Sequence, residues 1–273
     1  MYKRLIVFLL AFAVTVTSCR KAEVVTPAPD VAANDNKQLE ALFAGEPPHM
    51  CINKQVIDAD GKKTNGVVLR DKYWNNGKKI RIKFMNGTTF LRAKVLTYAR
   101  KWSEFANVTF LKVEGDEAHD LRIAFKFNGD TGSWSYYGTD ARLIDKSGPT
   151  MNFGWFTATT DEAEFSRVII HEIGHALGLG HEQSSPAVNI KWNKTNVYWY
   201  YQRPPNNWTI AQIDNNIFQK FTPEQVYYSP FDPKSIMQYP VDPRFTTNGQ
   251  TIGINTILSS MDKIVISKVY PKN

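Results

Sequence analysis

The first regular alternation of polar and apolar residues along the chain lies at residues 79–84, Lys-Ile-Arg-Ile-Lys-Phe. A strand with one buried face has this pattern, because its successive side chains point to opposite sides. Short apolar runs at residues 108–113, 121–127 and 150–156 predict three further strands, and we place the last at an edge of the sheet. The middle of the chain therefore predicts a sheet of short strands.

Apolar residues that recur every three or four positions predict three helices. The first spans residues 89–107 behind a threonine cap, and the second spans residues 161–177, where Asp161 and Glu164 have the spacing of a capping box. The third covers residues 259–269, after a stretch rich in loops and aromatic residues. We expect an α+β fold in two lobes: a twisted mixed sheet with two helices, then an irregular half with a terminal helix.

The first residues have the features of an export signal. Lys3 and Arg4 precede an apolar run at residues 5–16 that is too short to span a bilayer, so residues 1–18 are predicted to be a signal peptide. The ending Val-Thr-Ser-Cys at Cys19 resembles a bacterial lipobox, whose cysteine is lipidated after cleavage; an ordinary signal peptide with a chance cysteine is the alternative. We therefore expect an exported chain, held at the bacterial cell envelope by lipid on Cys19 or secreted.

The stretch that follows carries Cys51, the second of the two cysteines in the chain. If Cys19 carries lipid, Cys51 has no partner for an internal disulfide. Residues 20–36 lack periodicity and are predicted to be a flexible tether, and the stretch after them holds too little apolar surface for a separate domain. The predicted organisation is a linking segment at residues 19–64 and one folded domain at residues 65–273.

Composition limits the classes of partner. The 273 residues carry a net charge of +7, but the lysines and arginines are dispersed and form no dense block. A nucleic-acid-binding surface needs basic residues gathered on one face. We therefore expect no nucleic-acid partner.

The strongest chemical signal is the run His-Glu-Ile-Gly-His-Ala-Leu-Gly-Leu-Gly-His-Glu, which begins at His171. On a helix His171 and His175 share one face, so both imidazoles can bind one metal ion, and Glu172 reaches the open side of that metal. Gly178 lets the chain turn and bring back His181 as a third ligand. Three histidines leave a fourth position for water, which is typical of catalytic zinc.

A single histidine on an apolar face is more often a core residue than a metal ligand. Here three of the five histidines fall in one short segment at ligand spacing, together with the glutamate and the turning glycine. This combination favours a zinc site. The other two histidines, His49 and His119, lack such a context and are expected at the surface.

The extended pattern HExxHxxGxxH, followed by a methionine-containing turn, is the signature of the metzincins. Ser-Ile-Met-Gln-Tyr at residues 235–239 resembles that turn. Glu182 directly after the third histidine, and Tyr239 two residues after Met237, resemble the astacin family in particular, and the similarity covers residues 65–273. The resemblance implies a metzincin fold and a zinc endopeptidase that cleaves polypeptides.

Some positions depart from the astacin pattern. Ser133 stands where a cysteine is usual, Gln238 where a histidine is usual and Leu179 where a phenylalanine is usual. The domain also lacks the disulfides common in that family. None of these changes removes a predicted zinc ligand or base.

The resemblance implies roles for the residues of the site. Zinc would act as a Lewis acid, and Glu172 would take a proton from water and deliver it to the leaving amine. Tyr239 would bind zinc in the resting state and then stabilise the oxyanion; an ordinary core aromatic is the alternative. Met237 would pack beneath the site, and an extended substrate would add as a strand to the edge predicted near residues 151–155.

The same resemblance implies a latent precursor, with residues 19–64 as tether and inhibitory pro-segment. Astacin pro-segments supply a zinc ligand through Phe-x-Gly-Asp, and Phe-Ala-Gly-Glu at residues 43–46 is similar, with Glu46 in place of the aspartate. Cys51 lies nearby, and a thiolate is an excellent zinc ligand. We favour Cys51 as the latency ligand, with Glu46 second and a spectator cysteine as the third alternative.

An activating protease would cut near Lys63, just before the astacin-like region. In astacins the new N-terminal amine pairs with the glutamate after the third histidine, here Glu182. Lipid on Cys19 would stay with the pro-segment, so one cut would uncover the zinc and free a monomeric enzyme from the membrane. Two rival interpretations are a metzincin outside the astacin family and a non-catalytic envelope lipoprotein that keeps the fold for binding.

Overall fold

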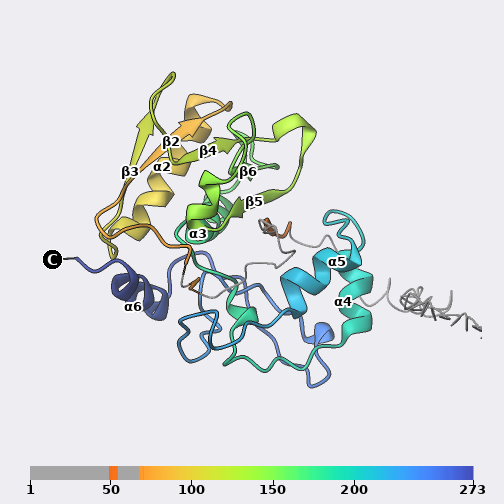
Figure 1. Cartoon of the computed structure of the whole chain (residues 1–273). Coiled ribbons are helices and arrows are strands. Elements are labelled where there is room, and N and C mark those ends of the chain that lie inside the picture. Colours follow the sequence, from red (N-terminus) through yellow and green to blue (C-terminus); the bar gives the residue numbers. More distant parts are fainter. Residues whose placement is uncertain (1–48, 55–67, 70, 273) are drawn as a thin grey trace, which may run out of the picture. The chain divides into compact units, whose positions relative to one another are not determined.

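The computed structural model describes three ranges of the chain, residues 49–54, 68–69 and 71–272. All of them belong to one unit, Phe43–Asn273 (Figure 1). The predicted signal peptide, Cys19, the tether, Glu46 and the predicted cut near Lys63 lie outside the described residues. Within the described ranges, no helix combines the length and the apolar character that crossing a membrane requires.

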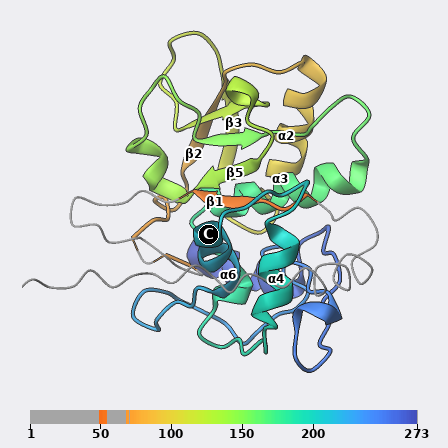
Figure 2. The ribbon, with the colours of Figure 1, turned by 90° about the vertical axis from the view of Figure 1, so that its right-hand side faces the viewer.

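A mixed sheet of six strands forms in the described chain, in the spatial order β1-β5-β6-β4-β2-β3 (Figure 1). The strands are β1 (Ile52–Lys54), β2 (Lys79–Phe84), β3 (Thr109–Val113), β4 (Leu121–Ala124), β5 (Ser133–Tyr136) and β6 (Met151–Phe153). Strands β2, β3, β4 and β6 run in one direction, and β5 runs antiparallel to β6. Strand β1 adds to the free side of β5, parallel to it (Figure 2).

Five α-helices accompany the sheet in the described residues: α2 (Thr89–Ser103), α3 (Glu162–Ala176), α4 (Lys194–Tyr201), α5 (Ile210–Ile213) and α6 (Ser260–Val269). Helices α2 and α3 pack on each other, and the Trp102 indole donates a hydrogen bond of 2.9 Å to the carbonyl oxygen of Ile170. Buried residues of β2, α2 and α3 share one hydrophobic cluster. Between α3 and α6 the described chain forms short helices, turns and isolated bridges, so the predicted α+β arrangement is confirmed.

Most predicted elements are confirmed with shifted ends. Strand β2 coincides with the alternating run, and α2 begins behind Thr88, whose hydroxyl accepts a hydrogen bond of 3.3 Å from the Leu91 amide. Helix α2 ends ahead of Asn107, its predicted last residue. The reason is that the Asn107 backbone bonds to Gly77 and Tyr270 instead of continuing the helix.

The capping box predicted at the start of α3 is wrong. Asp161 occupies the capping position, but its side chain makes no capping hydrogen bond. Glu164 instead accepts hydrogen bonds from Arg167, at 2.7 and 2.8 Å, and from the Trp155 indole at 3.0 Å. A charge-assisted, bidentate partner is stronger than a backbone amide, so the arginine takes the carboxylate.

The edge strand predicted at residues 150–156 is also wrong. Strand β6 covers only Met151–Phe153, all three residues are buried, and it pairs with β4 on one side and β5 on the other. Both faces of β6 are buried: Met151 and Phe153 are apolar, and the buried Asn152 side chain bonds to the backbone of Phe127 and Gly132. The next strand, β5, alternates serine with aromatic residues; it would be the edge without β1, which pairs with its outer side and ends the described sheet.

The methionine-containing turn is held in place by α6. Asp262 caps α6 and also accepts hydrogen bonds from the Ser235 hydroxyl at 2.7 Å and the Ile236 amide at 2.8 Å. Met237 then lies against Gly174 of α3, since a Cβ atom there would come within 2.5 Å of the Met237 sulfur. The turn therefore packs directly on the histidine helix.

Replacing Asp262 should loosen this connection. We expect Asp262→Ala to lower the free energy of unfolding by about 2–3 kcal/mol, because it leaves buried donors of the turn without acceptors. Asp262→Asn keeps one oxygen acceptor and should lose less. Urea denaturation of the full chain measures both, with Asp116→Ala in an exposed loop as control. A change of under about 0.5 kcal/mol for Asp262→Ala would show that the turn does not depend on α6.

Candidate metal centre

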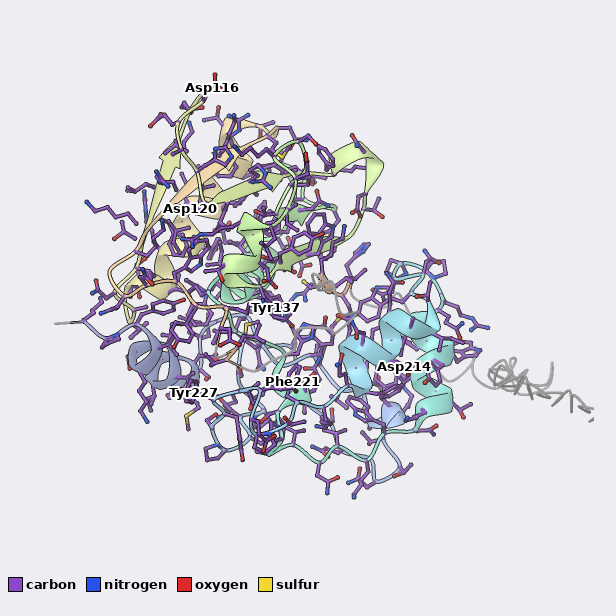
Figure 3. All side chains as sticks on the ribbon, viewed as in Figure 1. Asp116, Asp120, Tyr137, Asp214, Phe221 and Tyr227 are labelled. Atoms are coloured by element: carbon purple, nitrogen blue, oxygen red, sulfur yellow. The ribbon has the colours of Figure 1, made fainter. Side chains whose placement is uncertain are left out.

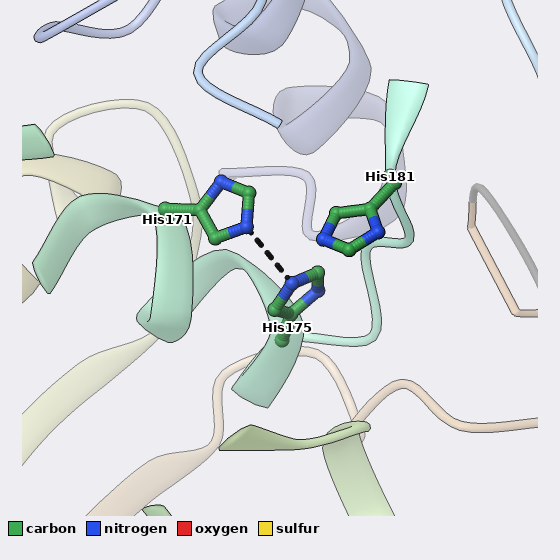
Figure 4. A group of neighbouring side chains, drawn as sticks. All are labelled: His171, His175 and His181. Carbon is green, nitrogen blue, oxygen red and sulfur yellow. Dashed lines mark hydrogen bonds between the residues drawn. The ribbon is translucent and has the colours of Figure 1, made fainter. Parts of the chain in front are cut away.

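The first two histidines of the motif lie one turn apart on α3, and both are buried. The Nδ1 atom of His171 lies 2.8 Å from the carbonyl oxygen of Ile236, and Nδ1 of His175 lies 2.7 Å from that of Leu179. A carbonyl oxygen can only accept, so both Nδ1 atoms carry the proton. The two Nε2 atoms then hold lone pairs, and they face each other at 3.1 Å (Figure 4).

The third histidine is delivered by the turn after α3. Gly178 has a φ of +93°, which glycine adopts without strain, and its amide caps the helix on the His175 carbonyl oxygen at 2.8 Å. The His181 ring centre then lies 4.8 Å from that of His175 and 5.3 Å from that of His171. The three imidazoles offer ligand atoms that all lie within 4.8 Å of one another (Figure 4).

Burial keeps these imidazoles neutral. It lowers the pKa of His171 to about 4, and burial and then the neighbouring imidazoles hold the pKa values of His175 and His181 well below their usual range. The neutral form is the one that binds a metal ion. Lone pairs that converge in a buried space otherwise repel, so this donor set fits a cation such as zinc.

Glu172 lies beside the histidines and is fully buried. Among the described residues, no nitrogen or oxygen donor bonds to its carboxylate oxygens, and the Cys51 thiol is the donor beside them. Burial raises the pKa of Glu172 to about 8, and the hydrogen bond from Cys51 and the Arg167 guanidinium oppose that rise. A buried carboxylate with so few donors needs a cation or water, which supports the same site.

Two aromatic residues enclose the histidines. Tyr137, labelled in Figure 3, packs edge-on against His175 with ring centres 5.2 Å apart. The Tyr239 ring centre lies 4.2 Å from that of His181, and the Tyr239 hydroxyl donates a hydrogen bond to the carbonyl oxygen of Cys51. Burial, followed by Cys51 and Glu172, raises the pKa of Tyr239, so the phenol stays protonated and able to donate.

Residues 49–54 cross this centre. The Cys51 side chain is buried, and its sulfur groups with ligand atoms of His171 and Glu172, all within 4.8 Å of one another. Burial, and then the charge of Glu172, raise the pKa of the Cys51 thiol. The Met50 amide donates a hydrogen bond of 3.0 Å to the Asn206 side-chain oxygen. The segment therefore lies over the histidines. The hydrogen bond between Met50 and Asn206 holds it on one side, and the pairing of β1 with β5 holds it on the other.

Glu182 lies on another side of His181, next to a cavity of about 630 Å³ that Asp232 and Asp262 also line. Its carboxylate accepts a hydrogen bond of 3.0 Å from the Asp232 amide. Burial raises the pKa of Glu182 to about 7, and the two aspartates add to the rise. The glutamate thus faces a space lined by other carboxylates.

The structure brings together most of the predicted site: His171, His175, His181, Glu172, Tyr239, Met237 and Cys51. Glu46 lies outside the described residues, so its role is open. His119 is half-exposed and meets only the Glu117 backbone in its hydrogen bonds. His49 differs from its predicted surface position, because its ring is half-buried and stacks on Trp155.

Arg167 was not predicted from the sequence, although its guanidinium lies near both Cys51 and Glu172. It stands four residues before His171, so the helical period places it on the face of α3 that carries the histidines, and that spacing could have identified it. Asn206 offered no such signal, because a loop far away in the sequence carries it to the site.

Comparison with known proteins agrees with this geometry. The matrixin family model (Peptidase_M10) matches residues 73–220, more than half of the chain. Serralysin A of Dickeya chrysanthemi is 31% identical over 90 residues, which cover 30% of this chain and 19% of that protein. Matrix metalloproteinase-2 of Drosophila melanogaster is 29% identical over 109 residues, covering 35% of this chain and 14% of that protein. The matches span less than a fifth of either relative.

A solved structure of myroilysin is similar over a larger share of both chains. It is 45% identical, with a TM-score of 0.72, and the alignment covers 76% of this chain and 98% of that one. Because the sequence identity is high and the alignment covers most of both chains, the similarity extends beyond the fold. The predicted metzincin metallopeptidase is confirmed, and zinc is the metal of this family. This chain belongs to the matrixin family.

Proposed function

We propose that this protein is an astacin-like zinc endopeptidase that is exported as a latent precursor. The observation that carries the proposal is the pair of His171 and His175 Nε2 lone pairs, which face each other at 3.1 Å beside the buried carboxylate of Glu172. His171, His175 and His181 would hold the zinc through their imidazole nitrogens. When bound, zinc supplies Lewis acidity at the scissile carbonyl and lowers the pKa of nearby water.

Glu172 is the proposed general base and acid. Its carboxylate lies inside the centre beside the histidines, where it can accept a proton from water and return it to the leaving amine. Burial raises its pKa to about 8, and a neighbouring dication lowers the pKa again. The carboxylate is then in the basic form at neutral pH.

Tyr239 is the proposed hydrogen-bond donor to the reacting carbonyl. Its hydroxyl already donates to the backbone carbonyl of Cys51, which lies in the segment across the site. A substrate carbonyl in the same place would receive the same bond, and a donor aimed at developing charge stabilises the transition state. This role, with Glu182 after the third histidine, supports the astacin-like type over other metzincins.

The substrate is proposed to be an extended polypeptide that pairs with β5. Strand β1 shows that this edge accepts an added strand, with Ile52, Asn53 and Lys54 opposite Trp134, Ser135 and Tyr136. Main-chain pairing suits many sequences, and pockets for alternate side chains then add selectivity.

Latency is proposed to come from Cys51. Its thiol lies among the ligand atoms of the centre, which supports Cys51 over Glu46 as the group that blocks the metal. A dication would lower the pKa of the thiol and favour the thiolate. Within the described residues Cys51 is a free, buried cysteine without a disulfide partner.

Export, lipid attachment on Cys19 and release by a cut near Lys63 complete the proposal. They are supported by the sequence of residues 1–18 and by the position of the blocking segment ahead of the folded domain. The cavity beside Glu182 offers room for a new N-terminal amine, and the high pKa of this carboxyl would fall on pairing with it. The cut would then release the lipid anchor together with the pro-segment.

The full chain should bind one zinc ion. We expect His171→Ala and His175→Ala to reduce bound zinc below about one-tenth of an ion per chain, because each removes a ligand nitrogen. His119→Ala, outside the cluster, should keep the full content. Elemental analysis after dialysis measures the zinc, and unchanged zinc in both ligand variants would place the metal elsewhere.

Trypsin nicking of the purified chain should produce hydrolysis of labelled casein that a zinc chelator abolishes. Glu172→Gln should lose at least about a hundredfold in rate, the scale of general acid–base catalysis, while it keeps its zinc. If the nicked wild type binds zinc but cleaves neither casein nor a broad peptide mixture, the non-catalytic interpretation is favoured instead.

Cys51→Ser should weaken latency without nicking. The fraction of active enzyme should rise about tenfold for each 1.4 kcal/mol by which the thiolate had stabilised the blocked state. Met50→Leu, a neighbour whose backbone contact is unchanged, is the matched control and should stay latent. Casein hydrolysis by the uncut chains measures the difference, and a fully latent Cys51→Ser variant would leave Glu46 as the candidate ligand.

A further inference from the structure

His49 is the first described residue of the segment across the site, and it is held through both its ring and its backbone. The His49 ring stacks on the Trp155 indole, with ring centres 4.9 Å apart and an interplanar angle of 20°. The carbonyl oxygen of His49 accepts a hydrogen bond of 2.9 Å from Arg167 Nη2. Side chain and backbone of the same residue are therefore both bound.

The surface that holds His49 is braced by the chain itself. Glu164 accepts 2.7 and 2.8 Å hydrogen bonds from Arg167 and one of 3.0 Å from the Trp155 indole, so a single carboxylate fixes both groups. Behind it, Trp155 meets Phe156 edge-on, and Phe156 stacks on Phe153 at 4.9 Å. None of these contacts involves residues 49–54, so the surface persists when that segment leaves.

Its position places it in the path of a substrate. Arg167 stands one helical turn before His171, and Cys51, two residues after His49, lies at the histidines. Any extended peptide that crosses the metal centre along β5 must therefore pass this surface within a few residues of its cleaved bond.

Resting on the proposed function, we propose that Trp155, Glu164 and Arg167 form a substrate subsite that selects a planar aromatic side chain. Trp155 stacks on the ring, Arg167 binds the backbone carbonyl of the same residue, and Glu164 positions both. Glu164 also matches the charge of Arg167 in a bidentate pair, so the subsite favours a ring over a carboxylate. Offset stacking adds about 0.5–1.5 kcal/mol beyond burial of the ring, which corresponds to about twofold to tenfold in selectivity.

A binding experiment tests the subsite without relying on catalysis. The probe is a synthetic peptide of residues 47–54 with histidine, phenylalanine or alanine at position 49. Calorimetry measures its affinity for nicked Glu172→Gln protein freed of its pro-segment. We expect the phenylalanine peptide to bind at least as tightly as the histidine peptide, and the alanine peptide about three- to tenfold more weakly. Trp155→Ala should abolish this difference and Trp155→Phe should restore most of it.

A cleavage experiment then tests selection among substrates. The nicked wild type, Trp155→Ala and the control Phe90→Ala, an exposed aromatic on α2, are compared on a peptide mixture by mass spectrometry of the products. Peptides with an aromatic residue at one fixed position near the cut should dominate, and only Trp155→Ala should lose that preference. Equal affinity of the three probe peptides, or an acidic preference, would overturn the proposal. A nicked wild type that distinguishes the probes but cleaves nothing would overturn the proposed function and leave the subsite standing.

Discussion

Two hydrogen bonds from imidazole N–H groups to backbone carbonyls set up the whole centre. They fix the tautomers of His171 and His175, turn both Nε2 lone pairs inward and place these atoms 3.1 Å apart. The acceptors are carbonyls of Ile236 and Leu179, so the turn after the helix and the methionine-containing turn both orient the ligands. Such outer partners govern the geometry and the basicity of metal-binding histidines.

Other parts of the fold fix the positions of the Ile236 and Leu179 carbonyls. Gly178 lets the chain reverse so that Leu179 reaches His175, and Asp262 at the start of α6 holds the backbone of Ile236. Gly174 leaves room for Met237 to pack on α3. The C-terminal helix thus acts on the site through the turn, although it contributes no ligand.

Local spacing made much of the site predictable from the sequence. The helical period alone places His171, Glu172 and His175, and Gly178 marks the turn that brings back His181. The resemblance to known families supplied the turn with Met237, and the unpaired thiol suggested Cys51 as a candidate blocking group; the structure brings both of these residues to the histidines.

Features that depend on distant parts of the chain were not predictable in this way. The strand order is one example: β6 lies inside the sheet between β4 and β5, and the composition of a strand indicates that it is buried but not which strands flank it. Glu164 matched a capping pattern, yet it pairs with Arg167 and Trp155. Asp262 completes the capping box of α6 and also accepts a hydrogen bond from the Ile236 amide in the turn. No local sequence pattern indicates this second partner.

Residues 49–54 are bound by groups that a substrate would also use: the β5 edge, the Tyr239 hydroxyl and Arg167. Under the proposed function, one set of contacts would serve latency first and substrate binding later. The proposed difference between the two states lies at Cys51, because a thiolate on the metal would occupy the position that water needs.

X-ray absorption at the zinc edge of the full chain tests this account most directly. The account predicts three imidazole nitrogens and one sulfur at about 2.3 Å, with the sulfur replaced by a light atom after the pro-segment is cut away. A spectrum without sulfur in the uncut chain, or one with fewer than three imidazoles in the cut chain, would contradict it.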